Sequence, residues 1–227
     1  MSRYHKLLLG IFLAVWAWSA VRPKYPHDWL LENILVLIFA PIIIFLARYL
    51  RLSNLSYTLI TIFMCLHLIG AHYTYSEVPF GYLLQKWLGA RRNMYDRLVH
   101  FSFGFLLAYP IREMFMRVAR VRGFWSFYLP FDVTLSFSGA YEIIEWVTAA
   151  KVRPEAALAF LGTQGDVWDA QKDMLMASLG AILAMLIIAL INWRYNPDFA
   201  RELKESFSVG PDDAPLGESL LEQWRRR

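Results

Sequence analysis

The sequence predicts an all-α protein, a polytopic membrane bundle of about six transmembrane helices. Hydrophobic residues make up 57% of its 227 residues, a larger share than an ordinary soluble domain of this length carries. They gather in apolar runs that approach the roughly 17 to 25 residues needed to cross a bilayer as a helix. The runs cover residues 7–21, 30–47, 55–71, 98–116, 124–149 and 174–193. We therefore expect a transmembrane helix bundle over residues 1–195 and a flexible cytoplasmic tail over residues 196–227, which is rich in Gly, Pro and Asp.

The first apolar run has two interpretations. Basic residues precede it and the small residues Ser19 and Ala20 follow it, as in a secretory signal peptide. Bulky Trp16 and Trp18 crowd the region where cleavage would occur, which favours a retained helix.

Prolines and small residues mark the later runs. Pro41, Pro110 and Pro130 fall inside three of them, and we expect kinks there because neighbouring helices can satisfy the freed carbonyl groups. The last run carries small residues that predict a close-packing face for a neighbouring helix. These are Ala177, Ser178, Gly180, Ala181 and Ala184.

The distribution of Lys and Arg predicts the orientation. Basic residues are more numerous on the side of the bundle that carries both termini, whereas Arg97 and Lys172 on the other side lie close to acidic residues. The positive-inside rule therefore places both termini in the cytoplasm. If the multi-pass protein lies in a bacterial inner membrane, the opposite face of the bundle is exposed to the periplasm. The net charge of +4 is spread without a basic stripe, so we expect no nucleic-acid partner.

Most of the acidic residues and histidines that would be costly in a membrane lie where the runs meet one and the same membrane face. Charge at or inside a bilayer costs free energy, so repeated placement on one side indicates a shared site facing outward. The residues are His67, His72, Asp96, His100, Glu142, Glu145, Asp166, Asp169 and Asp173.

Helical spacing predicts which of these side chains meet. Residues three, four or seven positions apart share a helix face, so three helices each present one polar stripe. The stripes are Asn93, Asp96, Arg97 and His100; Glu142 and Glu145; and Asp166, Asp169 and Asp173. His67 and His72 are five apart and point in different directions. We favour His72, because it begins a polar segment that leaves the membrane at the same face.

Three segments carry a resemblance to a known family. They are residues 93–101 (NMYDRLVHF), 141–146 (YEIIEW) and 162–174 (GTQGDVWDAQKDM). With them the chain resembles the YjdF-like inner-membrane proteins, a family of unknown function. More distantly it is similar to VanZ-like membrane proteins, some of which are associated with glycopeptide antibiotic resistance. Residues that carry this second pattern are Asp96, Arg97, His100, Phe101, Glu142, Asp169, Asp173 and Gly180.

Two chemistries suit the predicted site. In the first, carboxylates and a histidine bind a divalent metal ion that activates water or holds a phosphate. Its predicted ligands are Glu142, Glu145, Asp169, Asp173 and His72. In the second, cations, with Arg91 or Arg92 as further candidates, bind an anionic lipid head group, acidic residues orient the cations, and His100 serves as acid or base. Its predicted substrate-binding residues are Arg97, Lys172 and Tyr141, and its predicted catalytic residues are His100, Asp96 and Glu142.

Three functions remain open from the residues alone. The first is an enzyme that acts on a membrane lipid or on a lipid-linked precursor of the cell envelope. The second is lipid binding or transport without chemistry, with the acidic residues as proton or cation sites. The third is a structural membrane protein in which the polar residues fix helix packing. Membrane lipids are the expected partner, and neither the oligomeric state nor the identity of a metal can be read from this sequence.

Overall fold

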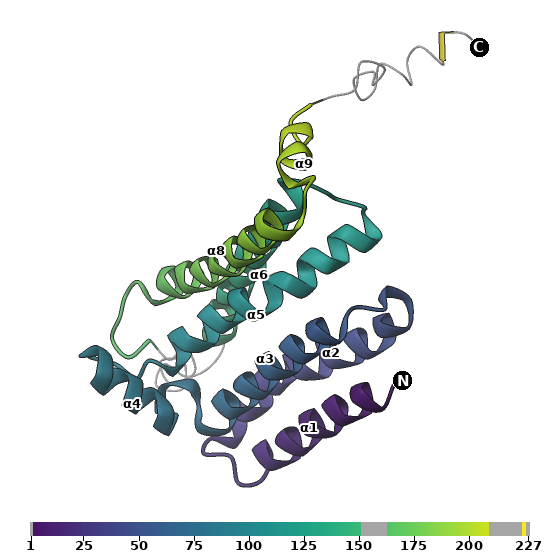
Figure 1. Ribbon diagram of the computed structural model, residues 1–227. Helices are drawn as coiled ribbons and strands as arrows, with labels where there is room; N and C mark the ends of the chain where they lie inside the picture. Colours follow the sequence, from purple (N-terminus) through teal and green to yellow (C-terminus); the bar gives the residue numbers. More distant parts are fainter. Residues whose placement is uncertain (1, 151–162, 209–223, 226–227) are drawn as a thin grey trace.

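The computed structural model describes residues 2–150, 163–208 and 224–225, and the regular structure in these ranges is helical. Each predicted apolar run coincides with a long helix, which confirms the all-α bundle (Figure 1). The long helices are α1 (Arg3–Ser19), α2 (Pro26–Leu50), α3 (Asn54–Tyr73), α5 (Tyr95–Val118), α6 (Trp125–Ala149) and α8 (Asp169–Tyr195). Shorter helices are η1 (Tyr75–Glu77), α4 (Pro79–Leu88) and α9 (Phe199–Glu205).

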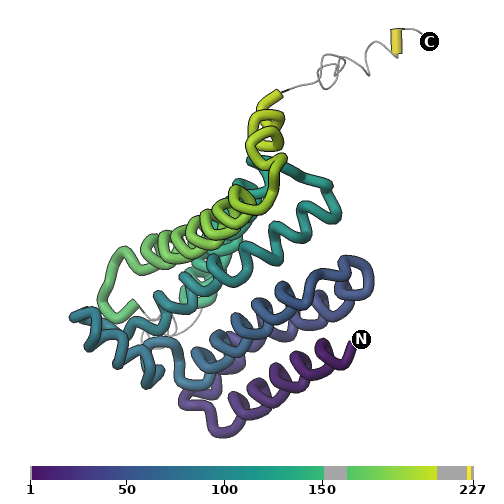
Figure 2. The backbone as a smooth tube through the Cα atoms, in the orientation of Figure 1, coloured from purple at the N-terminus to yellow at the C-terminus, as the bar shows by residue number. Residues whose placement is uncertain are grey.

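The long helices form two groups that lie side by side. Helices α1, α2 and α3 make one group, and α5, α6 and α8 make the other, as Figure 2 shows. Helix α3 packs against α5 and so joins the groups. The N-terminus and α9 lie at one end of the bundle, whereas α4 lies at the other end with the starts of α5 and α8 (Figure 1).

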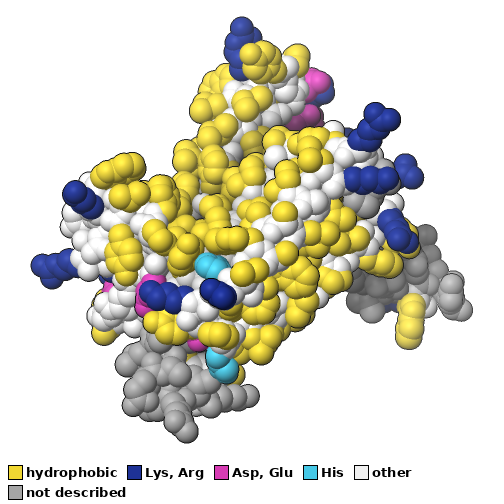
Figure 3. Space-filling view, turned by 90° about the horizontal axis from the view of Figure 1, so that it is seen from below, with side chains coloured by type: hydrophobic (Ala, Val, Ile, Leu, Met, Phe, Trp, Pro, Cys, Tyr) yellow, Lys and Arg dark blue, Asp and Glu magenta, His cyan; other side chains and the backbone are white. Residues whose placement is uncertain are grey.

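Three of the described helices, α2, α3 and α8, are long and apolar enough to cross a membrane by length and composition alone. Helix α1 has only 17 residues, and α5 and α6 carry polar side chains. On α5, Asp96 and Arg97 are buried inside the bundle, where neighbouring helices shelter them from lipid. Hydrophobic side chains cover much of the face in Figure 3, and most Lys and Arg side chains lie toward its two ends. The chain is therefore a multi-pass membrane protein.

The three prolines of the apolar runs lie within helices and not at their boundaries. Pro41, Pro110 and Pro130 lie inside α2, α5 and α6 without ending them.

The small residues of α8 bring its backbone against α5. A Cβ atom on Gly104 of α5 would collide with the backbone of Ala177, and one on Gly180 would collide with the backbone of Phe101. Ala177 and Ala181 are fully buried. Because the two helices approach this closely, their polar first turns face each other at one end of the bundle.

The expected flexible tail begins with an ordered segment. Phe199 of α9 is buried, with its ring 5.8 Å from that of Phe127. Ser206 accepts a hydrogen bond through Oγ from the backbone N–H of Phe124 (2.8 Å) and through its carbonyl from Trp125 Nε1 (2.9 Å). The first part of the predicted tail therefore forms α9 and contacts the start of α6. The part of the predicted tail at 209–223 lies outside the described residues.

Candidate functional site

An ion network joins the first turns of α5 and α8. Arg97 Nη2 lies 2.5 Å from Asp169 Oδ1, Arg97 Nη1 donates to the Asp169 carbonyl (2.9 Å), and Arg97 also pairs with Asp173. Arg92 pairs with Asp169 and lies 3.2 Å from Asp96 Oδ2. The side chains of Arg97 and Asp173 are only 6% and 4% exposed. Two of the three predicted stripes therefore meet, and they meet as buried ion pairs.

Asn93 holds the start of α5 in place. Its backbone N–H donates to Gln164 Oε1 (2.9 Å), and Gln164 Nε2 donates back to the Asn93 carbonyl (3.3 Å). Its side chain donates to the Val78 carbonyl (3.0 Å) and accepts from the N–H of Tyr95 (3.0 Å). Asn93 thus belongs to the predicted stripe, and its hydrogen bonds position the first turn of α5, which carries the other residues of that stripe.

His100 brings the third stripe into the same cluster. Its Nε2 lies 3.6 Å from Asp96 Oδ1 and 3.8 Å from Glu142 Oε1 on α6. Ligand atoms of Asp96, His100 and Asp173 all lie within 4.8 Å of one another. The side chain of Glu142 is only 10% exposed, and its Oε1 has no hydrogen-bond partner among the described residues.

Three residues outside the predicted set lie at the same end of the bundle. Glu32 of α2 is buried and accepts a hydrogen bond from the hydroxyl of Tyr141 (3.2 Å). His67 Nε2 lies 3.3 Å from the Glu32 carbonyl, and the hydroxyl of Tyr75 lies 2.6 Å from His67 Nδ1. A carbonyl oxygen only accepts, so His67 carries a proton on Nε2. Burial raises the pKa of Tyr75 well above its ordinary value, so this hydroxyl stays protonated.

A cavity of about 580 Å³ lies between α2, α3, α5 and α6. Its acidic and histidine lining lies at one end and consists of Glu32, His67, Asp96, His100 and Glu145, with Tyr75 and Tyr141 beside them. Beyond this end, most of the lining is aliphatic or aromatic. On α5 the lining runs from Asp96 to Met114, a length of about 27 Å at 1.5 Å per residue. The cavity is therefore long and apolar with polar side chains at one end, which suits an amphipathic ligand with a hydrocarbon chain and a polar head.

The structure places His72 away from the polar cluster and His67 beside the cavity. His72 Nδ1 donates to the Ser19 carbonyl (3.0 Å), and its ring centre lies 4.5 Å from that of Trp18 on α1. The five-residue offset turns His72 toward α1, whereas His67 faces α2 and the cavity. His72 is thus not a ligand of the cluster. Both ring nitrogens of His67 have hydrogen-bond partners, so it supports the cavity wall.

The predicted roles of the two cations also need correction. Lys172 is half exposed and pairs with Asp166 at 2.6 Å, outside the cavity. Hydrogen bonds from Lys172 and from the backbone N–H of Trp168 lower the pKa of Asp166. Arg97 is paired with buried carboxylates. Neither charge is left for a head group, because both are neutralised within the protein.

The remaining predicted residues divide between the network and the cavity. Two arginines already bind Asp169, so its carboxylate is not available as a metal ligand. Glu145 and Tyr141 line the cavity, and the ring of Tyr141 lies 6.0 Å from that of His100.

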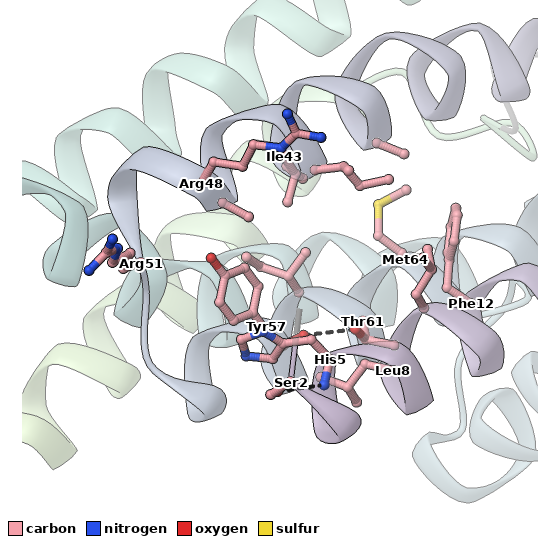
Figure 4. A pocket seen from close by; sticks show the side chains of 15 residues that line it. Ser2, His5, Leu8, Phe12, Ile43, Arg48, Arg51, Tyr57, Thr61 and Met64 are labelled. Atoms are coloured by element: carbon pink, nitrogen blue, oxygen red, sulfur yellow. Dashed lines mark hydrogen bonds between the residues drawn. The ribbon is translucent and has the colours of Figure 1, made fainter.

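A second cavity, of about 540 Å³, lies between α1, α2 and α3 near the N-terminus and shares Ile43, Tyr57 and Met64 with the apolar part of the first. Figure 4 shows Ser2, His5, Tyr57 and Arg48 around it, with the dashed hydrogen bond from the His5 N–H to Ser2 Oγ. Its lining contains no Asp or Glu among the described residues. It thus differs in chemistry from the cavity beside His100 and offers an internal control for it.

Comparison with known proteins identifies the family of the chain and a relative that is named as an inner membrane protein. Residues 4–194, which contain nearly all of the six long helices, match a family described as "Predicted membrane protein (DUF2238)". The inner membrane protein YjdF of Escherichia coli (strain K12) is 41% identical over 172 residues, which cover 74% of this chain and 82% of that protein. No solved structure matches the chain.

Proposed function

The chain belongs to the DUF2238 family of predicted membrane proteins, and from that premise we propose that it binds a lipid, or a lipid-linked precursor of the cell envelope, and acts on its polar end. The observation that carries this proposal is the one-ended polarity of the large cavity. A long apolar lining suits a hydrocarbon chain, and acidic and histidine side chains at one end suit a polar head group.

The chemistry falls to His100, Asp96 and Glu142. The imidazole stands between the two carboxylates, at 3.6 Å and 3.8 Å. A histidine held between carboxylates can act as an acid, a base or a metal ligand, and a carboxylate fixes the orientation of its ring. Tyr141 and Glu145 border the same space and would contact the head group.

The proposed location is the bacterial inner membrane, with both termini in the cytoplasm. Arg48, Arg51 and Arg117 lie at the end of the bundle where the N-terminus and α9 also lie, as the positive-inside rule requires for the cytoplasmic side. The polar end of the cavity then opens at the outer leaflet, where envelope precursors are handled after export.

Lipid chemistry is better supported than transport. A transported polar solute or ion needs a polar path to the second membrane face. Past His100, the lining of α5 is Phe103, Leu107, Ile111 and Met114, which suits a hydrocarbon chain and not a solute.

A cavity-filling series tests the proposal. Ala140 lines the large cavity and not the second one, so replacing it with Leu, Phe and Trp progressively fills the space for the chain. Lipid that co-purifies with the intact protein, measured by native mass spectrometry, is expected to fall at least about tenfold for Ala140→Trp, equivalent to about 1.4 kcal/mol of binding free energy.

The matched control fills the other cavity. Ala40 lines only the second cavity, so Ala40→Trp introduces the same side chain elsewhere in the bundle. We expect this variant to keep its bound lipid. Equal lipid loss in Ala40→Trp and Ala140→Trp, or no loss along the Ala140 series, would contradict the proposal.

A further inference from the structure

The polar cluster of Asp96, His100, Asp173 and Glu142 has the composition of a metal site, and its members Asp96 and His100 also line the cavity between α2, α3, α5 and α6. We infer that it holds one divalent transition-metal ion, ligated by Asp96, His100 and Asp173, with Glu142 completing the set. The inference rests on the proposed function only in one respect, namely that a lipid is the substrate on which the ion would act. Binding of the ion itself is a property of these four residues.

The distances fit a single ion. Metal bonds to His nitrogen and carboxylate oxygen are about 2.0 to 2.2 Å long, so neighbouring ligands of one tetrahedral ion lie about 3.4 Å apart. His100 Nε2 is 3.6 Å from Asp96 Oδ1 and 3.8 Å from Glu142 Oε1. The ligand atoms of Asp96, His100 and Asp173 lie within 4.8 Å of one another. Small side-chain rotations would close the set around an ion.

The excess negative charge of the cluster favours binding of a cation. Four carboxylates, those of Asp96, Glu142, Asp169 and Asp173, face two guanidinium groups, those of Arg92 and Arg97. With the carboxylates ionised, this leaves an excess of two negative charges in a buried place, which is costly unless compensated. A divalent ion cancels both charges, whereas a proton cancels only one.

Glu142 supplies an independent observation. Its side chain is nine-tenths buried and points toward His100, yet Oε1 has no hydrogen-bond partner among the described residues. Buried polar atoms are normally satisfied, and an orphaned one marks a place for an ion, a water or a ligand. A metal ion between Glu142 and His100 would satisfy this oxygen.

The donor set indicates the class of ion. One imidazole and several carboxylates suit Zn²⁺, Mn²⁺ or Fe²⁺, whereas Mg²⁺ and Ca²⁺ prefer oxygen ligands alone. With the ion bound, the site becomes neutral and can accept the phosphate of a lipid head group, which an excess of carboxylates would repel. In this form of the site His100 is a ligand of the ion, and the loss of turnover in His100→Gln would follow from loss of the ion.

Metal analysis of the full-length protein tests this inference without any lipid. Detergent-purified protein is loaded with Mn²⁺ or Zn²⁺, desalted, and its metal content is measured by mass spectrometry. We expect about one ion per chain, and in Glu142→Gln an affinity weaker by more than about 100-fold, since loss of even an outer contact costs about 10- to 100-fold. Glu142 is the first choice because its removal breaks no ion pair with Lys or Arg among the described residues.

The matched control is Glu77→Gln. Glu77 is an acidic residue at the same end of the bundle that pairs with Lys24, outside the cluster. It is expected to retain the ion, and electron paramagnetic resonance of bound Mn²⁺ is expected to change in Glu142→Gln but not in Glu77→Gln. Absence of bound metal in the wild type, or equal metal content in both variants, would overturn the inference. The two proposals can fail separately. If the wild type binds the metal but the Ala140 series shows no loss of lipid, the proposed function is contradicted and the metal site is still supported.

Discussion

Arg97→Gln is expected to destabilise the bundle by about 3 to 5 kcal/mol, the usual cost of removing one partner from a buried ion pair. Asp173 would remain buried without its arginine, and Asp169 would keep only Arg92 as a counter-charge. The carbonyl of Asp169 would also lose a hydrogen bond at the start of α8. Thermal unfolding of the detergent-purified protein, followed by circular dichroism, measures the effect.

A second substitution tests the cause of this loss. In the double variant Arg97→Gln, Asp173→Asn, the carboxylate that lost its arginine is replaced by a neutral amide, so we expect part of the lost stability to return. Arg201→Gln serves as a control, because Arg201 and Asp198 form an exposed ion pair on α9 worth roughly 0 to 1 kcal/mol. If Arg97→Gln were as mild as Arg201→Gln, the ion network would not hold α5 against α8.

His100→Gln is expected to lower lipid turnover by about 10²- to 10⁴-fold, the usual contribution of a catalytic acid or base. The substitution removes the nitrogen that faces Asp96 and Glu142 and leaves the apolar lining intact. Proteoliposomes of a bacterial lipid extract, analysed by mass spectrometry over time, would show which lipid species the wild type consumes. Bound lipid in the variant is expected to stay at the level of the wild type.

His72→Gln is the matched control for this experiment. His72 lies against Trp18 and Ser19, away from the cavity, so turnover should be unchanged. A wild type that binds lipid but converts none would contradict the enzymatic part of the proposal and leave a lipid-binding protein. Equal losses in His100→Gln and His72→Gln would indicate an effect on folding.

The helices could be predicted because hydrophobic length is a strong local signal. Each apolar run coincides with a helix, and the small residues from Ala177 to Ala184 predict the contact that α8 makes with α5. Helix α9 could not be predicted in the same way. Its order depends on Phe199 and Ser206 contacting α6, and a seven-residue helix has little intrinsic stability.

The convergence of the polar stripes could also be predicted, but their pairing could not. Spacing indicates which side chains share a helix face, and it correctly joins Asp96 with His100 on α5. It does not give the order of helices around the bundle. For this reason neither the approach of Glu32 from α2 nor the turn of His72 toward α1 could be read from the sequence.

One signal for the missed residues was present in the sequence. Glu32 is an acidic residue inside the apolar run at 30–47, and an ionisable residue within a span is a functional candidate by default.

Photolabelling with a lipid tests the central claim most directly, namely that the polar cluster and the cavity form one lipid site. A phospholipid with a diazirine in its acyl chain is reconstituted with the wild-type protein, activated by light, and located by peptide mass spectrometry. We predict labels on the cavity-lining parts of α5 and α6, at residues 96–114 and 137–145, and their loss in Ala140→Trp. Labels confined to exposed positions such as Leu186 and Leu190 of α8, unchanged in Ala140→Trp, would contradict it.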